Sequence, residues 1–412
     1  MTLEVKTKDL ELWIFQYLWV IILLPKALQF MVYFGLLGLI LLKKQKVQIR
    51  PATIFIVGGS FVQIISIIRQ CIITDPSMSR VAAALNTSLI WVLGAVFYTI
   101  FATTEPDEEF LNKIIKAIKI NLIILVGLWL FSLISPVDSF SIAGHTWQLR
   151  RMDYLSSGIT KRFSALTETV LGPSHILSFS LPLLFFDKQN KNRFITFGII
   201  LASYIAVFAT HSRMGALCCA AMVLIYFRWY IKNSHPGKLE QIFDAAVILG
   251  VIILIILFRQ ELWSKVIGLF NARAGSNDAR FSIYRLSLQK MWDTSPLIGC
   301  GIKNMITMGN GYQFPYGSHS MYIGFLYKVG IIGTILYLTG FVHILVNIWN
   351  GLHSNKNRLG ILLIILCYFG FLIFADLDGS NYVLISVFSV WGILSNQKLM
   401  EGIDGEENRT AV

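Results

Sequence analysis

Charged residues are scarce in this sequence. Of its 412 residues, 14% are charged and 55% are hydrophobic, whereas soluble domains carry about 25% charged residues. This shortage leaves too little polar surface for a soluble globule of the same size, and it excludes that class. The chain consists instead of repeated apolar runs of roughly 16–23 residues between short charged loops, the pattern of a helical protein that crosses a membrane many times.

Metal-binding and disulfide spacings are also missing. The five cysteines lie mostly within apolar runs, and we interpret them as small packing residues. The net charge is +12, but no basic stretch outside the apolar runs is long enough for a nucleic-acid-binding domain, so no nucleic acid is expected as a partner. No cleavable leader pattern precedes the first apolar run, and we expect none to be removed.

The apolar runs predict an all-α polytopic membrane protein with about 12 transmembrane helices in a single domain, residues 1–412. No internal repeat divides the chain into related halves. The predicted spans are 12–25, 27–42, 52–68, 81–103, 120–135, 170–186, 194–210, 214–227, 242–258, 320–349, 359–375 and 382–396.

Basic residues in alternate loops predict the orientation. Clusters near residues 43–46, 113–119, 188–193, 228–238 and 356–358 fall at every second loop. With twelve spans these loops share one side with both termini, and the positive-inside rule makes that side cytoplasmic. The loops at about 136–169, 211–213 and 260–318 then lie outside the cytoplasm.

Arginine and lysine divide unequally between the two sides. By this assignment 10 of the 15 arginines lie outside, whereas 14 of the 20 lysines lie inside. The planar guanidinium of arginine binds phosphate oxygens bidentately, while lysine acts as a point charge. We therefore interpret the outer face as a binding surface for a phosphate group. The alternative is that these arginines only pair with lipid headgroups.

The longest polar interval, residues 260–318, is predicted to be an external loop whose short helices carry part of an active site. Asp278 is a candidate N-cap for one helix, and Pro296 lies beyond its end. At 100° per residue, one arc of about 140° would form an apolar stripe for burial against the bundle or an acyl chain. In order around the helix, that arc contains Arg280, Met291, Tyr284, Leu288, Phe281, Trp292 and Arg285.

Three further polar segments lie at the outer ends of predicted spans, where polar side chains are costly in lipid and usually functional. They contain Arg162 with Glu168, Arg213, and His319. Arg162 and Glu168 precede the segment Gly172 to His175, and Arg213 occupies a sharp break between two apolar runs. Arg213 is either a phosphate ligand within the bundle or a snorkelling residue.

His319 ends the basic loop, and it could deprotonate a sugar hydroxyl as a general base. The alternative is an ordinary interface histidine; His175 and His211 are weaker candidates of the same kind. Lys328, about 13 Å further along its span, is expected to face a polar cavity.

Four motifs follow one another between about residues 150 and 335. They are Arg162 followed by Pro-Ser-His (173–175), Ser-Arg-Met-Gly (212–215), Arg280 leading to Pro-Leu-Ile-Gly-Cys-Gly (296–301), and His319 followed by Gly-Ile-Ile-Gly (330–333). With the long external loop, this series resembles the O-antigen ligase and capsular polysaccharide polymerase family of bacterial envelopes. Ser320 departs from the pattern, because many relatives have Asn after this His.

The resemblance implies a GT-C-like glycosyltransferase that is metal-independent, inverting and without a cofactor. It would act at the outer face of the bacterial cytoplasmic membrane on a glycan linked to undecaprenyl diphosphate, with a second glycan as acceptor. Membrane lipids, and a chain-length regulator and a flippase, are compatible partners. Carried over, Arg213 and Arg280 would bind the diphosphate, and His319 would orient or deprotonate the acceptor hydroxyl. The supporting substrate-binding candidates are Arg162, Arg285, Glu168, His175, Tyr322 and Lys328.

Three functions remain open on sequence grounds. The segment 172–175 preceded by Glu168 looks more like exopolysaccharide and capsule polymerases than like ligases, which move the glycan to lipid A core or another acceptor. A transporter or flippase for lipid-linked sugar would also need cations. Carriers usually show two related halves, whereas this chain has one long loop with no symmetric partner.

Overall fold

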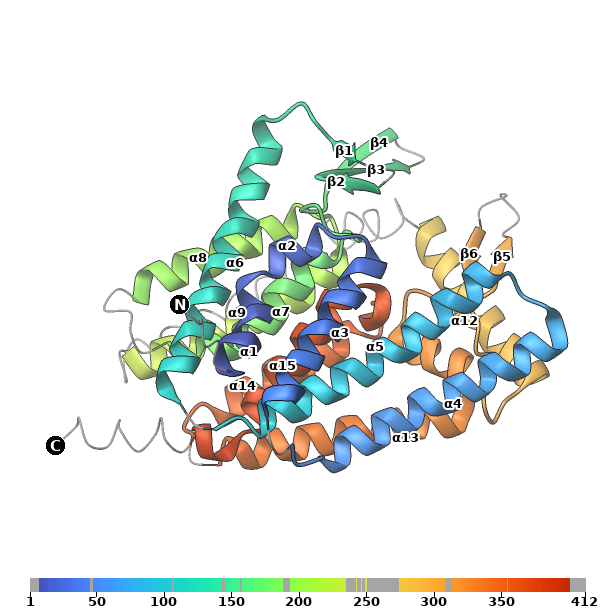
Figure 1. Ribbon diagram of the computed structural model, residues 1–412. Coiled ribbons are helices and arrows are strands. Elements are labelled where there is room, and N and C mark those ends of the chain that lie inside the picture. The colour runs from blue at the N-terminus through green and yellow to red at the C-terminus, as the bar shows by residue number, and fades with distance from the viewer. Residues whose placement is uncertain are drawn as a thin grey trace.

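The computed structural model shows a helical bundle with short β-hairpins along one side (Figure 1). It describes residues 7–44, 47–105, 107–142, 145–155, 158–187, 193–234, 242, 246, 249, 274–307, 313–353 and 355–400. The helices are α1 (Thr7–Gln16), α2 (Leu18–Ile22), α3 (Lys26–Lys43), α4 (Pro51–Thr74), α5 (Met78–Ala102), α6 (Glu108–Ile134), α7 (Gly172–Leu184), α8 (Arg193–Phe208), α9 (Arg213–Ser234), α12 (Ala274–Thr294), α13 (Met321–Gly351), α14 (Arg358–Phe371), the 3-10 turn η2 (Leu377–Gly379) and α15 (Asn381–Leu394).

In this part of the chain, six helices are long and apolar enough to cross a membrane: α3, α4, α5, α6, α9 and α13. Three shorter apolar helices, α8, α14 and α15, accompany them. The chain is therefore a polytopic, mostly helical membrane protein. The count of twelve stays a prediction, and the predicted span 242–258 lies outside the described ranges apart from residues 242, 246 and 249.

The extent of α6 differs from the prediction. We expected a span at 120–135, but the helix begins at Glu108 and runs for 27 residues. The carboxylate of Asp107 accepts hydrogen bonds from the backbone N–H groups of Glu109 and Phe110, and this N-cap starts the helix.

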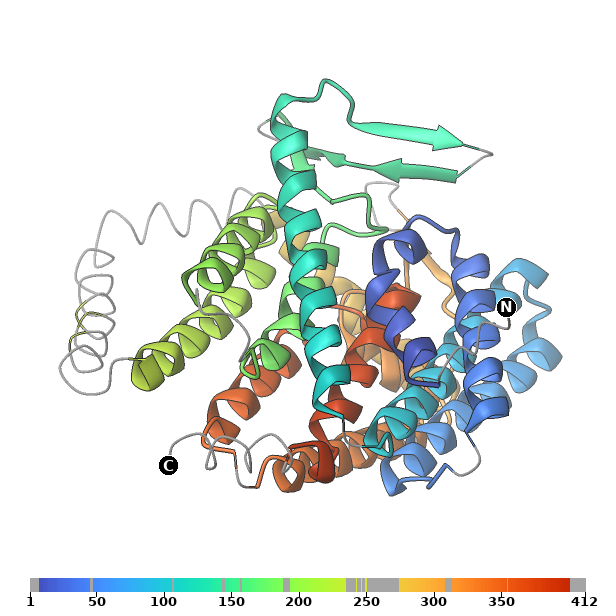
Figure 2. The same ribbon diagram turned by 60° about the vertical axis from the view of Figure 1, so that its left-hand side comes forward.

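Three antiparallel hairpins were not expected from the sequence. They are β1 (Ser139–Ile142) with β2 (His145–Gln148), β3 (Arg150–Leu155) with β4 (Gly158–Phe163), and β5 (Met305–Thr307) with β6 (Gln313–Pro315). In the β3–β4 register, Arg151 lies opposite Arg162. Figure 2 shows the teal strands at the top of the molecule and the end of the last helix (dark red) at the bottom.

The centre of the bundle is an aromatic cluster around Trp91 of α5. Its ring lies 5.1 Å from the rings of both Phe325 and Tyr337 in α13, and 5.8 Å from that of Phe388 in α15. These four side chains are fully buried. Large aromatic rings supply much of the packing in such a core, so α5, α13 and α15 form a rigid frame below the hairpins.

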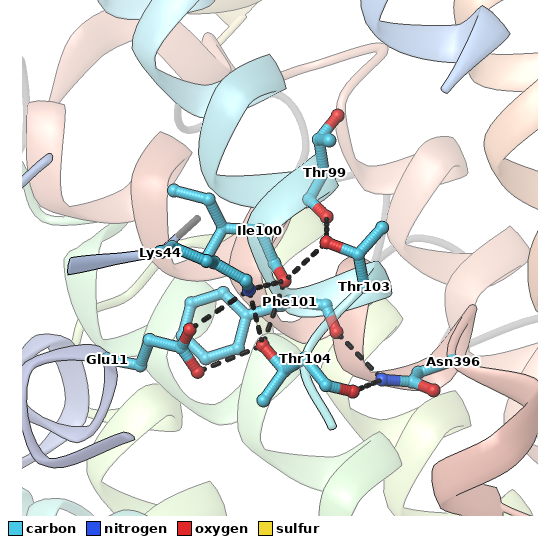
Figure 3. Close-up of polar contacts among 8 residues, drawn as sticks. All are labelled: Glu11, Lys44, Thr99, Ile100, Phe101, Thr103, Thr104 and Asn396. Atoms are coloured by element: carbon cyan, nitrogen blue, oxygen red, sulfur yellow. Dashed lines mark hydrogen bonds and ion pairs between the residues drawn. The ribbon is translucent and has the colours of Figure 1, made fainter. Parts of the chain in front are cut away.

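Residues beside loops that we predicted on the cytoplasmic side meet at one end of the bundle, and Figure 3 shows the polar contacts among them. The Lys44 ammonium group, after α3, forms an ion pair with Glu11 of α1 at 3.3 Å and donates to the Ile100 carbonyl of α5 at 3.0 Å. Beyond α15, the Asn396 amide donates to the backbone carbonyl of Thr104 at 2.7 Å. The ends of α1, α3, α5 and α15 are thereby tied together.

Loops that we predicted on the outer side meet at the other end. Lys26, at the start of α3, forms an ion pair with Glu168 at 3.2 Å and donates to the Gly379 carbonyl at 2.7 Å. Ser380 donates to the same carboxylate at 3.1 Å. The contacts of Lys44 and Lys26 thus lie at the two ends of α3, and the side of the membrane that each end faces stays a prediction.

A break in α13 docks the external loop onto the bundle. Gly330 has φ 61° and ψ −163°, which interrupts the helix. The backbone of segment 296–301 forms hydrogen bonds with the backbone of α13 on both sides of this break. Gly299, whose φ is +75°, must be a glycine, because a Cβ there would lie 2.5 Å from the Gly330 nitrogen. The pairing N–H to carbonyl bonds are Cys300 to Tyr327 (2.7 Å), Gly301 to Lys328 (2.9 Å), Ile331 to Pro296 (2.9 Å) and Ile332 to Leu297 (3.0 Å).

Candidate active site

His319 lies where α12, α13 and the α14–α15 loop meet. Its backbone N–H donates to a carboxylate oxygen of Asp376 at 3.2 Å, and its carbonyl accepts from the Tyr284 hydroxyl of α12 at 2.8 Å. Its φ of 66° is uncommon for a residue with a side chain. Two distant elements therefore hold this backbone from both sides. Ser320, next in the chain, is the N-cap of α13 and accepts from the Ile323 N–H at 3.4 Å, a role that Asn performs equally well.

Arg280 lies one turn before Tyr284 on α12, and its side chain is half-buried. Burial lowers the pKa of Arg280, and the nearby charge of Arg162 lowers it further, against the opposing effect of Tyr284. An arginine nevertheless keeps its proton at neutral pH. Within the described ranges, no carboxylate forms an ion pair with Arg280. Burying a charge without a counter-ion is costly, so this guanidinium is a candidate binding position for an anion.

Arg162, whose charge acts on Arg280, is bonded to the segment that leads into α9. Its Nε donates to the Thr210 carbonyl at 2.7 Å, and Phe163 N–H donates to the Ala209 carbonyl at 3.2 Å. Strand β4 thus holds the turn that leads directly to Arg213, the first residue of α9.

The start of α7 lies against the same turn. A Cβ built on Gly215 would lie 2.5 Å from the Ser174 hydroxyl oxygen, so only a glycine allows this approach. The motifs 173–175 and 212–215, separate in sequence, therefore pack against each other. The Ser-Arg-Met-Gly motif owes its glycine to this contact.

The surroundings of His319 favour the neutral imidazole. Burial lowers the pKa of His319, and the charges of Arg280, Lys303 and Arg151 lower it further, while Asp376 opposes them. A neutral ring has a free nitrogen that can accept a proton. His319 is therefore close enough to feel the charges of Arg280, Lys303 and Arg151, and Arg280 in turn feels the charge of Arg162. We call these residues the electrostatic neighbourhood of His319.

Two acids in the α14–α15 loop belong to this neighbourhood and were not predicted. Asp376 approaches the Lys303 ammonium group at 3.7 Å, and its second carboxylate oxygen is buried with no hydrogen-bond partner in the described part of the chain. Burial alone would lower the pKa of Lys303, but the negative charges of Asp376 and Asp378 have the larger effect and raise this pKa. The signal in the sequence was an Asp-Leu-Asp between the last two apolar runs on the predicted outer side.

Lys328 has an acidic partner in the α14–α15 loop. It is buried and forms an ion pair with Asp378, which also accepts from the Trp91 indole N–H at 3.2 Å. Burial would raise the pKa of Asp378, but Lys328 and Lys303 hold it below its ordinary value. This placement anchors the α14–α15 loop to the aromatic core; substrate binding by Lys328 stays a prediction.

The other candidate residues lie around the site rather than at its centre. His175 is buried and shares a 2.7 Å hydrogen bond with the Tyr368 hydroxyl, and the Tyr322 hydroxyl donates to the Phe369 carbonyl at 3.1 Å. Glu168 ties α3 to the segment before α15, as described above. His211 and Arg285 are exposed. Direct substrate contact by these residues remains a prediction.

The predicted N-cap of α12 was wrong, and only part of the predicted apolar stripe faces the bundle. The helix begins at Ala274 instead of being capped by Asp278, and its buried face is centred on Ile283, Ser287 and Met291. Phe281 and Trp292 of this stripe are each 66% exposed, so they do not face the bundle, which was the first of the two alternatives for the stripe. The reason is the small side chain of Ser287, whose hydroxyl accepts from Gly317 N–H at 2.8 Å and lets the loop before His319 pack closely.

Part of the chain matches a known protein family. Residues 197–338 match a family whose model is described as O-antigen ligase. The matched segment runs from within α8 to within α13 and contains Arg213, Arg280 and His319. No curated protein matches the chain.

Proposed function

From the match of residues 197–338 to the O-antigen ligase family, we propose that the chain polymerises oligosaccharide repeat units linked to undecaprenyl diphosphate. The product is a bacterial surface polysaccharide, such as a capsule or exopolysaccharide, made at the outer face of the cytoplasmic membrane. One observation carries the proposal: the half-buried Arg280 has no carboxylate partner in the described ranges and lies near Arg162 and His319.

The proposed reaction is a direct displacement at the anomeric carbon. An acceptor hydroxyl forms the new C–O bond as the bond to the diphosphate oxygen breaks, which inverts the anomeric centre. The hydroxyl proton passes to the neutral ring of His319, and the electron pair of the broken bond leaves with the lipid diphosphate. Arg280 and Arg213 bind that diphosphate, and Arg162 holds the turn that carries Arg213.

Fixed cations are the main contribution of this site to the rate. Negative charge grows on the diphosphate as it leaves, and groups already held in place stabilise that charge without reorganising. Removing one such group from other enzymes lowers kcat by about 10²–10³. On the acceptor side, hydrogen bonds between the His319 backbone and the side chains of Asp376 and Tyr284 hold the general base in place in the same way.

A ligase reaction is the second candidate, because the matched family is described as O-antigen ligase. Both reactions use the same lipid-linked donor and the same leaving group. They differ only in the acceptor, which is another lipid-linked glycan in the polymerase and a different molecule in the ligase. The cation site described above serves either reaction.

Purified protein in a lipid nanodisc, incubated with lipid-linked repeat units alone, tests the proposal. A polymerase gives a ladder of products that increase by one repeat unit. A ligase gives none until a separate acceptor is added. Translocation of intact donor across liposomes, without a new glycosidic bond, would contradict both enzymatic functions and support a flippase. Arg280→Ala is the inactive control for the ladder, and Lys290→Ala, at an exposed position of the same helix, is its matched active control.

A further inference from the structure

A groove of about 480 Å³ lies between α12 and α13, away from the charged residues of the active site. Met291 is buried at its floor, and Trp292 at its edge is largely exposed. The lining side chains are mostly apolar, with Gln289 and Asp293 the exceptions. The lining residues are Leu288, Gln289, Met291, Trp292, Asp293, Leu326 and Ile331.

Arg280 and part of the groove lie on the same side of α12. Residues spaced by three or four lie on the same side of a helix, and Arg280, Tyr284, Leu288 and Met291 follow this spacing. At 1.5 Å per residue, Leu288 and Met291 lie about 12 and 16 Å beyond Arg280 along the axis. One helix side therefore leads from an arginine without an acidic partner in the described ranges to an apolar groove, over a length that a few prenyl units span.

The surface around the groove is suited to hydrocarbon. Trp292, Leu297 and Ile332 are 66%, 59% and 44% exposed, respectively. Ile332 belongs to α13, one of the helices long and apolar enough to cross the membrane. Apolar side chains exposed beside such a helix are stable against lipid but not against water, so the groove opens toward the bilayer.

We infer that this groove holds the first prenyl units of the lipid whose diphosphate binds at Arg280. The inference rests on the proposed function, because it takes the donor to be a lipid diphosphate. A glycan does not fit the groove, since sugar hydroxyls would be left without hydrogen-bond partners on the apolar side chains. A prenyl chain has no such groups, and its attached diphosphate matches the charge of Arg280.

Photo-crosslinking tests occupancy without requiring turnover. A benzophenone-bearing amino acid replaces Leu288 in one variant and Ser282 in the other; Ser282 is exposed and about 120° around the same helix. A radiolabelled prenyl diphosphate should label the Leu288 variant, and excess unlabelled prenyl diphosphate should abolish that labelling. Equal labelling of both variants would overturn the inference, as would equal competition by a phospholipid, which would identify an ordinary acyl-chain site.

Donor chain length provides the kinetic test. In the wild type, KM should fall about tenfold, or about 1.4 kcal/mol, from a donor with one prenyl unit, too short to reach Leu288, to a full-length donor. Leu288→Asn, which places an amide without hydrogen-bond partners against the prenyl chain, should abolish most of that difference while leaving KM for the short donor unchanged. Ser282→Asn, the matched control, should preserve it. Chain-length dependence that survives in full in Leu288→Asn would contradict the inference.

The two proposals fail in different ways. If the wild type forms no glycosidic bond but the Leu288 probe is labelled specifically, the proposed enzyme function fails and the lipid groove stands. If the wild type polymerises donors of every chain length equally well and the probe is not labelled, the groove fails and the enzyme function stands.

Discussion

Asp376 accepts a hydrogen bond from the backbone N–H of His319 at 3.2 Å across 57 residues of sequence. The carboxylate therefore acts on this histidine in two ways. It holds the backbone at a positive φ, and its charge raises the pKa of His319 against the lowering effects of burial and three cations. Substitutions at Asp376 can separate these two effects.

Asp376→Asn keeps a hydrogen-bond acceptor for the His319 N–H but removes the charge. The pKa of His319 should then fall further, because the one group that raises it has become neutral. We expect the acid limb of the pH–rate profile to move to lower pH, with kcat about tenfold lower, or about 1.4 kcal/mol. Asp376→Ala should cost more, since it also releases the backbone. An unchanged acid limb in Asp376→Asn would contradict this role.

His319→Ala should lower kcat by about 10²–10⁴-fold, the usual contribution of a general base. Donor binding should change little, because the diphosphate contacts belong to the arginines. In the wild type, the pKa of His319 lies below the ordinary value of about 6.5, so the ring is neutral at pH 7. Activity should therefore fall only when the pH drops below this lowered pKa. Isothermal titration with the donor, beside rate measurements, separates the two quantities; a loss of binding equal to the loss of rate would argue against a base.

Arg280→Ala should abolish polymer formation, with kcat at least about 10²-fold lower, while the protein still inserts into the membrane. Lys290→Ala is the matched control: it removes one positive charge from the same helix, but at an exposed position that is not a candidate for substrate binding. We expect it to stay within about twofold of the wild type, since exposed substitutions away from a site have small effects. Quantified ladders from the two variants check this. Equal losses would mean that the helix needs its net charge rather than a positioned guanidinium.

Chelation distinguishes the proposed mechanism from metal-assisted transfer. If fixed guanidinium groups alone stabilise the leaving diphosphate, EDTA should leave the rate of polymer formation unchanged. The measurement uses purified protein exchanged into metal-free buffer, with and without added Mg²⁺ or Mn²⁺. Strong inhibition by EDTA that either metal reverses would overturn the metal-free mechanism.

Much of the arrangement was accessible from sequence because it follows from lipid solvation. Apolar runs predict helices, and the alternating basic loops predict two ends, which the contacts of Lys44 and Lys26 place at opposite ends of the bundle. The buried face of α12 could not be predicted, since apolar side chains in a membrane protein may face lipid as readily as the core. Phe281 and Trp292 point outward while the small Ser287 packs inward.

The acids of the site were missed for a different reason. Asp376 and Asp378 follow a short helix and carry no motif of their own, so their partners appear only once the chain is folded. Lys303 and Lys328, which pair with them, lie 73 and 50 residues away in sequence. Hydrophobic periodicity reports which side of one helix is buried and contains no information on such pairs.

Gly299→Ala tests whether the broken helix α13 positions the loop that carries the site. The new Cβ would lie 2.5 Å from the backbone nitrogen of Gly330, at a residue whose φ is +75°, so the backbone pairing of 296–301 must open. We expect a loss of about 1–3 kcal/mol in the free energy of unfolding from the strained backbone, with loss of activity. Gly127→Ala is the control, because no atom lies within 4 Å of its added Cβ. Thermal unfolding in detergent compares the two. If Gly299→Ala unfolds at the wild-type temperature and still polymerises, the docked segment does not hold His319 and Arg280 in register.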